Sequence, residues 1–201
     1  MNNAVIVIFA IVLIGQFIYQ ILLTKKRKQI EENITNSIIQ GDFHEFHKII
    51  DQRETCKYIP IFNRLYLKMN VAFLQGDDNK LNETFDLMRK MKLSVKQKED
   101  VFSKAFNYYV EKGDKKKSKY YKDQILEISK NVGLRTLTKK TYSVMIEKSD
   151  EYLRQLLKEN EELKGNKRLS SDILLSKIYE NKGDEILAKK YLDQYKNDAK
   201  S

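Results

Sequence analysis

A Gly-Asp pair recurs along the chain at nearly constant intervals. The pairs begin at Gly41, Gly76, Gly113 and Gly183, so the successive spacings are 35, 37 and 70 residues. The longest spacing is two periods, and Ser149-Asp150 lies near its middle. Gly can adopt the left-handed conformation that ends a helix, and Asp can cap the next helix by accepting backbone N–H bonds. The pattern therefore predicts five helix-turn-helix units with a period of about 35 residues.

Composition agrees with an all-α fold. Seven Gly and one Pro in 201 residues are too few turn-forming residues for an all-β sandwich or barrel. Apolar residues recur at three- and four-residue spacing on both sides of the turns, as they do on amphipathic helices. We expect ten helices after the N-terminal segment, the first either separate from that segment or continuous with it. Three breaks and two helix N-caps are predicted between units: Pro60, Gly133 and Gly165, and Ser94 and Ser170.

The period and the turn resemble those of tetratricopeptide-repeat (TPR) proteins, whose helix hairpins recur at 34 residues. The fifth and third units carry the residues that most resemble the family pattern: Leu175, Ser176, Tyr179, Ala188 and Leu192, and Ala105, Tyr109 and Ser118. Elsewhere large residues such as Met69 and Tyr142 occupy the small positions, and the closing proline of the family is missing. The resemblance implies a TPR-like array of about five antiparallel hairpins, an α-solenoid, over residues 29–201.

The resemblance also implies a binding groove, because in TPR proteins the first helix of each hairpin lines the concave face. The corresponding positions here are Tyr66, Asn70, Phe73, Ser103, Asn107, Lys139, Ser143 and Lys177. Asn70 and Asn107 fall where such domains hold a peptide backbone, and side-chain amides can both donate and accept hydrogen bonds. The alternative is that Asn is simply abundant in this Lys- and Asn-rich chain.

The N-terminal segment predicts a membrane anchor. No charged side chain occurs in residues 1–24, and residues 4–14 are an unbroken apolar run. Residues 4–23 would form a helix of about 30 Å, the thickness of the hydrocarbon core of a bilayer. Gln16 and Gln20 either bond a partner helix or are tolerated near the membrane surface, and we favour the second interpretation. A cleaved secretory signal is the rival, but no basic residue precedes the apolar run and no small-x-small site follows it.

A basic cluster follows directly, at Lys25, Lys26, Arg27 and Lys28. It carries four of the ten net positive charges, and the positive-inside rule places it in the cytoplasm. We therefore expect a single-pass protein of the cell membrane with its N-terminus outside. The cluster could also bind anionic lipid, at about 1 kcal/mol per basic residue. The predicted organisation is an anchor at 1–24, a basic juxtamembrane segment at 25–28 and a cytoplasmic helical-repeat domain at 29–201.

The chain carries little sign of catalysis. His44 and His47 are its two histidines and Cys56 its one cysteine, and no phosphate loop or nucleophile motif occurs. Half-buried or surface histidines are a better interpretation than metal ligands, so we expect no enzymatic activity, cofactor or metal. Lysines crowd one helix start at Lys115, Lys116, Lys117, Lys119 and Lys122.

Two functions remain to be compared. The leading hypothesis is a membrane-tethered adaptor or scaffold that binds a protein or peptide partner through the helical-repeat groove. The alternative is a membrane-held basic module that binds nucleic acid or another polyanion through the lysine run. A solvated lysine face is the commoner origin of such a run, so a nucleic-acid partner is the less favoured of the two.

Overall fold

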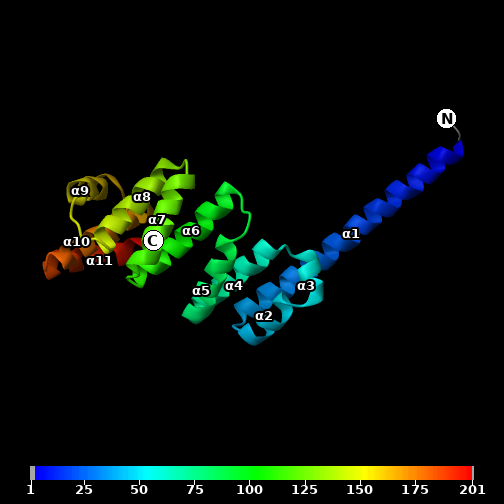
Figure 1. Ribbon diagram of the computed structural model, residues 1–201, viewed down its shortest axis with the longest axis horizontal. Coiled ribbons are helices and arrows are strands. Elements are labelled where there is room, and N and C mark those ends of the chain that lie inside the picture. Colours follow the sequence, from blue (N-terminus) through cyan, green and yellow to red (C-terminus); the bar gives the residue numbers. More distant parts are fainter. Residues whose placement is uncertain (1–2, 201) are drawn as a thin grey trace. The chain divides into compact units, whose positions relative to one another are not determined.

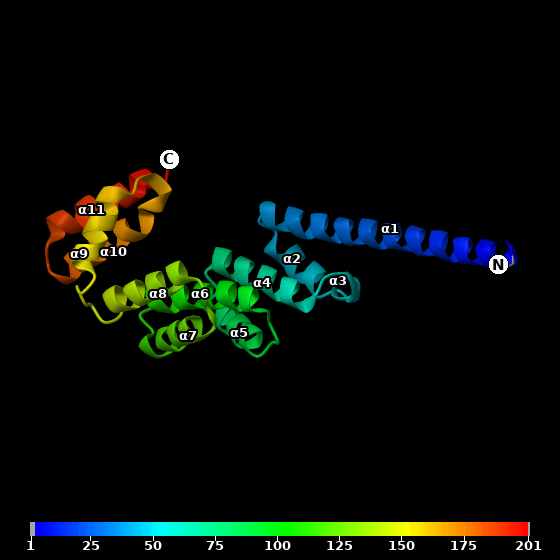
Figure 2. The same cartoon turned by 90° about the horizontal axis from the view of Figure 1, so that it is seen from above.

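The computed structural model describes residues 3–200, with side chains described at residue 20 and from residue 22 onward. Every regular element in this part of the chain is helical, which confirms the all-α prediction. The chain divides into two compact units between Met91 and Lys92, both visible in Figures 1 and 2. The first contains α1 (Asn3–Ile39), α2 (Phe43–Ile50), α3 (Arg53–Tyr58), α4 (Ile61–Gln75) and α5 (Asp78–Arg89). The second contains α6 (Val95–Glu111), α7 (Lys115–Ile128), α8 (Val132–Met145), α9 (Leu153–Glu162), α10 (Leu169–Asn181) and α11 (Glu185–Asp198).

The N-terminal segment and the first predicted repeat helix form one continuous helix, α1, of 37 residues. Within the residues that are described, no helix is both long enough and apolar enough to span a membrane. The side chains of the predicted anchor at residues 4–23 lie almost entirely outside that description. The anchor therefore stays a prediction.

The four Gly-Asp turns have one geometry, as their sequences predict. Each Gly is left-handed, with φ between +63° and +77°. The N–H of each following Asp donates to the carbonyl five residues earlier, at 2.9 Å in all four turns. The carboxylate of each Asp then accepts from the backbone N–H three residues later, at 2.9–3.0 Å. Each turn thus ends one helix with a left-handed residue and caps the next with a side chain.

The turn at Ser149-Asp150 departs from this geometry, and its assignment as an equivalent turn is wrong. Lys148 takes the left-handed conformation with φ +57°, and Ser149 N–H donates to Ser143 O, six residues back. Asp150 does not cap α9, because Tyr152 precedes that helix without a side-chain cap. Without Gly and a capping Asp in register, the chain makes a wider turn between α8 and α9.

The other predicted boundaries had mixed outcomes. Ser94 caps α6 in a capping box with Gln97, as expected, and Pro60 precedes α4. Ser170 is not an N-cap: it lies inside α10, which follows a 3₁₀ turn at Gly165–Lys167. Gly133 lies inside the first turn of α8 rather than between helices. The six-residue helix α3 was not predicted.

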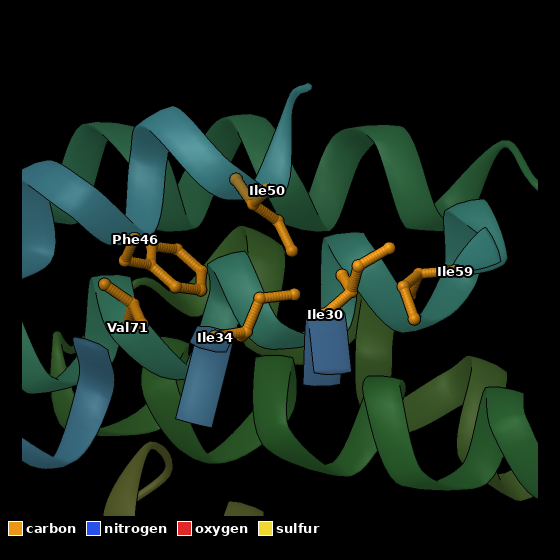
Figure 3. Close-up of a cluster of buried hydrophobic side chains, with 6 residues drawn as sticks. All are labelled: Ile30, Ile34, Phe46, Ile50, Ile59 and Val71. Carbon is orange, nitrogen blue, oxygen red and sulfur yellow. The ribbon is translucent and has the colours of Figure 1, made fainter. Parts of the chain in front are cut away.

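The first unit closes around a cluster of buried aliphatic and aromatic side chains. They come from α1, α2, α4 and the residue after α3, and Figure 3 shows them pointing toward one another: Ile30, Ile34, Phe46, Ile50, Ile59 and Val71. Ile34 is 2% exposed, and Phe46 and Ile50 are fully buried. The C-terminal part of α1 is therefore a core element of the unit and not a free linker.

The second unit has its own core. Val144, Leu156, Leu174, Leu175, Ile178 and Tyr191 form one buried cluster from α8 to α11. Tyrosines stack across two hairpins at equivalent places: Tyr109 on Tyr121 between α6 and α7, and Tyr179 on Tyr191 between α10 and α11. Ring centroids are 5.6 Å apart in both pairs. In each pair one ring lies four residues before the turn glycine and the other eight after it, so the two hairpins share one packing pattern.

Candidate functional site

The predicted binding residues of the first unit lie along one side of α4. Tyr66 and Asn70 are half-buried, and Phe73 is 37% exposed. Tyr66 packs against Phe62 at 5.8 Å between ring centroids, and Phe73 meets Phe85 of α5 edge-on at 6.0 Å. The side-chain amide of Asn70 makes no hydrogen bond within the described part of the chain. The result is a partly exposed aromatic strip with an available amide in its middle.

In the second unit, α6 carries Ser103 and Asn107. Ser103 is half-buried and its hydroxyl donates to Glu99 O at 2.6 Å, so its polar group is used within the helix. Asn107 is exposed, and among the described residues its amide has no hydrogen-bond partner. Asn107 precedes Gly113 by six residues, as Asn70 precedes Gly76. The two amides therefore occupy the same position relative to identical turns.

The remaining predicted groove residues lie on α8 and α10. Lys139 is exposed, whereas Ser143 is buried and its hydroxyl donates to Glu151 at 2.7 Å. Lys177 is half-buried and pairs with Glu180 at 2.7 Å. Of these three side chains, Lys139 is the one whose polar group is exposed and has no intramolecular partner among the described residues.

The basic cluster lies on α1 where the helix meets α3. Three of its cations have acidic partners: Lys26 with Glu54 of α3 at 3.1 Å, Arg27 with Glu31 at 2.8 Å and Lys28 with Glu32 at 3.9 Å. All of these pairs are exposed, so each is weakly held and can exchange with another anion. Lys25 is exposed and has no such pair among the described residues.

The lysine run at the start of α7 is partly engaged by the fold. Lys117 lies over the Tyr109 ring at 4.7 Å, and Lys122 over the Tyr142 ring at 4.1 Å. Lys119 pairs with Asp123 at 2.8 Å, and this bond raises the pKa of the ammonium group. Burial raises the pKa of the Tyr142 hydroxyl. Lys115 and Lys116 remain as exposed cations, a small area for a polyanion.

Tyr121, within the same run, is 3% exposed and packs in the core, so it presents no ring for base stacking.

The histidines lie on α2 without a metal-binding arrangement. His44 is exposed, and His47 is half-buried with its ring edge-on to Phe46 at 5.2 Å. Across the residues described, no group of three or more His, Cys, Asp or Glu side chains is placed to hold a metal. His47 instead borders a hollow of about 230 Å³ in the first unit, whose lining includes Asp51 and Lys68, an ion pair at 2.8 Å. No local sequence pattern predicts this hollow, because its lining comes from three different helices.

Comparison with known proteins adds no relative: no protein-family model, curated protein or solved structure matches the chain.

Proposed function

We propose that the chain is a single-pass membrane-tethered adaptor whose helical hairpins form a TPR-like array and bind a protein segment on the cytoplasmic side. The observation that carries the proposal is the aromatic strip of α4 with the available amide of Asn70. Partly exposed aromatic side chains give large contact area at little cost in conformational entropy, and they dominate many binding interfaces. An amide among them can pair with both the N–H and the C=O of an extended peptide.

The four identical turns support the repeat. Their shared left-handed glycine, hydrogen bond and Asp cap are what a repeated hairpin requires, and the equivalent tyrosine stacks extend the likeness into the packing. A hairpin of this size cannot bury its apolar face alone, so hairpins of one array stack on their neighbours. Such stacking presents the first helices as a recognition surface.

The uncharged residues 4–23 and the basic cluster after them support the anchor and its direction. Tethering places the adaptor at the membrane and raises its concentration near membrane-bound partners. This suits a scaffold for membrane complexes or envelope assembly. The polyanion alternative has less support, since three of the five lysines in the α7 run already have intramolecular partners.

Site-specific photo-crosslinking in cells tests the adaptor function. A photoreactive residue at Asn70 should capture one defined protein, while the same residue at Glu83, exposed on α5, should not. Adding Phe73→Ala should lower capture from position 70 by about tenfold, because loss of a central aromatic contact commonly costs more than 1 kcal/mol. Equal capture from positions 70 and 83, or capture that Phe73→Ala does not change, would count against the aromatic strip of α4 as the binding surface.

Topology is tested separately. A reporter fused after Ser201 should be active in the cytoplasm. An exported reporter would refute the cytoplasmic adaptor.

A further inference from the structure

A second surface lies where α3 rests on α1, which contacts it directly in the first unit (Figures 1 and 2). The two helices enclose an open hollow of about 380 Å³. Its lining combines two cations, two hydroxyls, one amide and one aliphatic side chain: Gln20, Leu23, Thr24, Arg27, Lys57 and Tyr58. The hollow therefore offers positive charge and hydrogen-bonding groups next to an apolar edge.

The position of α3 is fixed by three contacts. Thr55 is 1% exposed and Ile59 is 3% exposed, and Ile59 belongs to the core cluster of the unit. On the outer side, Lys26 of α1 pairs with Glu54 of α3 at 3.1 Å. These contacts hold Lys57 and Tyr58 at the hollow, with the Lys57 ammonium 5.4 Å from the centre of the Tyr58 ring.

Charge in this region is unbalanced. The cations are the four of the basic cluster together with Arg53 and Lys57 of α3, against the three carboxylates that pair with the cluster. Within the described part of the chain, neither Arg53 nor Lys57 has an acidic partner within 4 Å. The excess of three positive charges is concentrated on one helix turn of α1 and on α3, so an anion is the complementary ligand.

The hollow also has a definite level along α1. Leu23 ends the predicted membrane span and Thr24 follows it, so in the proposed anchored protein the hollow lies where phospholipid headgroups lie. A free anion would make no favourable contact with the apolar edge at Leu23, whereas a lipid would place its glycerol and first methylenes against it.

We propose that this hollow is a binding site for the headgroup of an anionic phospholipid, with its phosphate between Arg27 and Lys57 and its hydroxyl-bearing part near Thr24 and Tyr58. The site rests on the proposed anchor. In this proposal α3 is a second contact with the membrane surface, in addition to α1. Two contacts would hold the first unit in one orientation relative to the bilayer.

Lipid binding to the full chain in non-ionic detergent, measured by native mass spectrometry, tests the site. Phosphatidylglycerol should bind at least about tenfold more tightly than phosphatidylcholine with the same acyl chains. Lys57→Gln should weaken phosphatidylglycerol binding by about fivefold, the usual loss for one basic residue at a membrane surface, and leave phosphatidylcholine unchanged. Lys57→Arg, which keeps the charge, should bind as the native chain does.

Lys90→Gln is the matched control, because Lys90 is an exposed lysine of the same unit outside the hollow. Equal binding of the two lipids, or equal loss in Lys57→Gln and Lys90→Gln, would overturn the site. Displacement of phosphatidylglycerol by excess inorganic phosphate would overturn the lipid assignment. Circular dichroism checks the fold of each variant, and Arg27→Gln gives a second test if Lys57→Gln is misfolded.

Failure of the anchor has a different signature. Flotation of the full chain with pure phosphatidylcholine vesicles at high salt reports the apolar span alone, since headgroup attraction is then screened. A chain that does not float refutes the anchor, whatever the lipid titration shows. A chain that floats but does not discriminate between headgroups refutes the hollow alone.

Discussion

Replacing Gly113 with Ala should destabilise the second unit by about 1 kcal/mol through backbone conformation alone. Gly113 has φ +68°, and a Cβ built there would meet no atom within 4 Å. Steric crowding with other residues is therefore absent, and the cost is the strain of a left-handed L-residue, about 1–2 kcal/mol. The lower entropy of unfolded Ala offsets about 0.4–1 kcal/mol of this strain, so Gly113→Ala stays destabilising overall, by about 1 kcal/mol.

The assay is equilibrium urea unfolding of the full chain in detergent, followed by tyrosine fluorescence. Nine of the twelve tyrosines lie in residues 92–201, so the signal reports mainly on the second unit. A loss of about 1 kcal/mol makes the unfolding equilibrium about fivefold less favourable to the fold, and lowers the midpoint by roughly 0.3–1 M at a typical urea slope. The slope itself should not change.

Two further variants separate the explanations. Gly113→Asn should lose distinctly less than Gly113→Ala although Asn is larger, because Asn tolerates the left-handed region. Gly183→Ala should match Gly113→Ala, since φ is +77° there and the space is equally open. An unchanged midpoint for Gly113→Ala, or a larger loss for Asn than for Ala, would refute the reasoning that φ decides the cost.

Other consequences concern titration and the core. Burial raises the pKa of Asp172, so its contribution to the free energy of unfolding is full below the unfolded value of 3.8 and is lost as pH rises through the folded value. Hydrogen bonding to Lys182 lowers the pKa of Asp150, so its contribution is present above 3.8 and is lost as pH falls through the lowered value. Urea unfolding should therefore be compared at decreasing pH, starting from pH 7. As pH falls, the native chain should become more stable relative to Asp172→Asn and less stable relative to Asp150→Asn. If the free energy of unfolding of the native chain and the variant changed in parallel with pH, this expectation would be wrong. Ile34→Ala should lower the free energy of unfolding by about 2–5 kcal/mol, whereas Ile39→Ala, at a side chain that is 77% exposed, should lower it by less than about 0.5 kcal/mol. Equal shifts of the unfolding midpoint, followed by circular dichroism, would contradict the burial of Ile34.

The sequence predicted best those features that rest on a few adjacent residues. A Gly-Asp pair carries both the left-handed end of one helix and the cap of the next, and all four such turns were foreseen with their capping role. The capping box at Ser94 is equally local, because Gln97 supplies its other half three residues later. Local chemistry of this kind needs no knowledge of the tertiary fold.

Features that depend on distant partners were missed. The helix α3 has six residues and no side-chain cap, and it is held through Thr55, Ile59 and the ion pair with α1. Asp150 resembles the capping Asp of the other turns, yet its carboxylate accepts from Lys182, 32 residues away. The burial of Ser143 is likewise set by the fold. The family pattern predicts Ser143 as a groove residue, but its hydroxyl is buried and donates to Glu151.

The continuity of α1 decides how the two proposed activities relate. Between Leu23 and the first core residue, Ile30, there is no Gly or Pro, and the helix runs through the basic cluster without a break. Seven helical residues span about 10 Å, so the core of the first unit would begin within one to two helix turns of the membrane surface. A flexible linker would let the aromatic strip of α4 sample every orientation, whereas a helix fixed by Ile30 and Ile34 in the core would transmit the orientation of the proposed anchor to the unit. Headgroup binding at α3 would then limit rotation of the unit about the axis of α1. It would therefore orient the aromatic strip of α4 as well as hold it near the membrane.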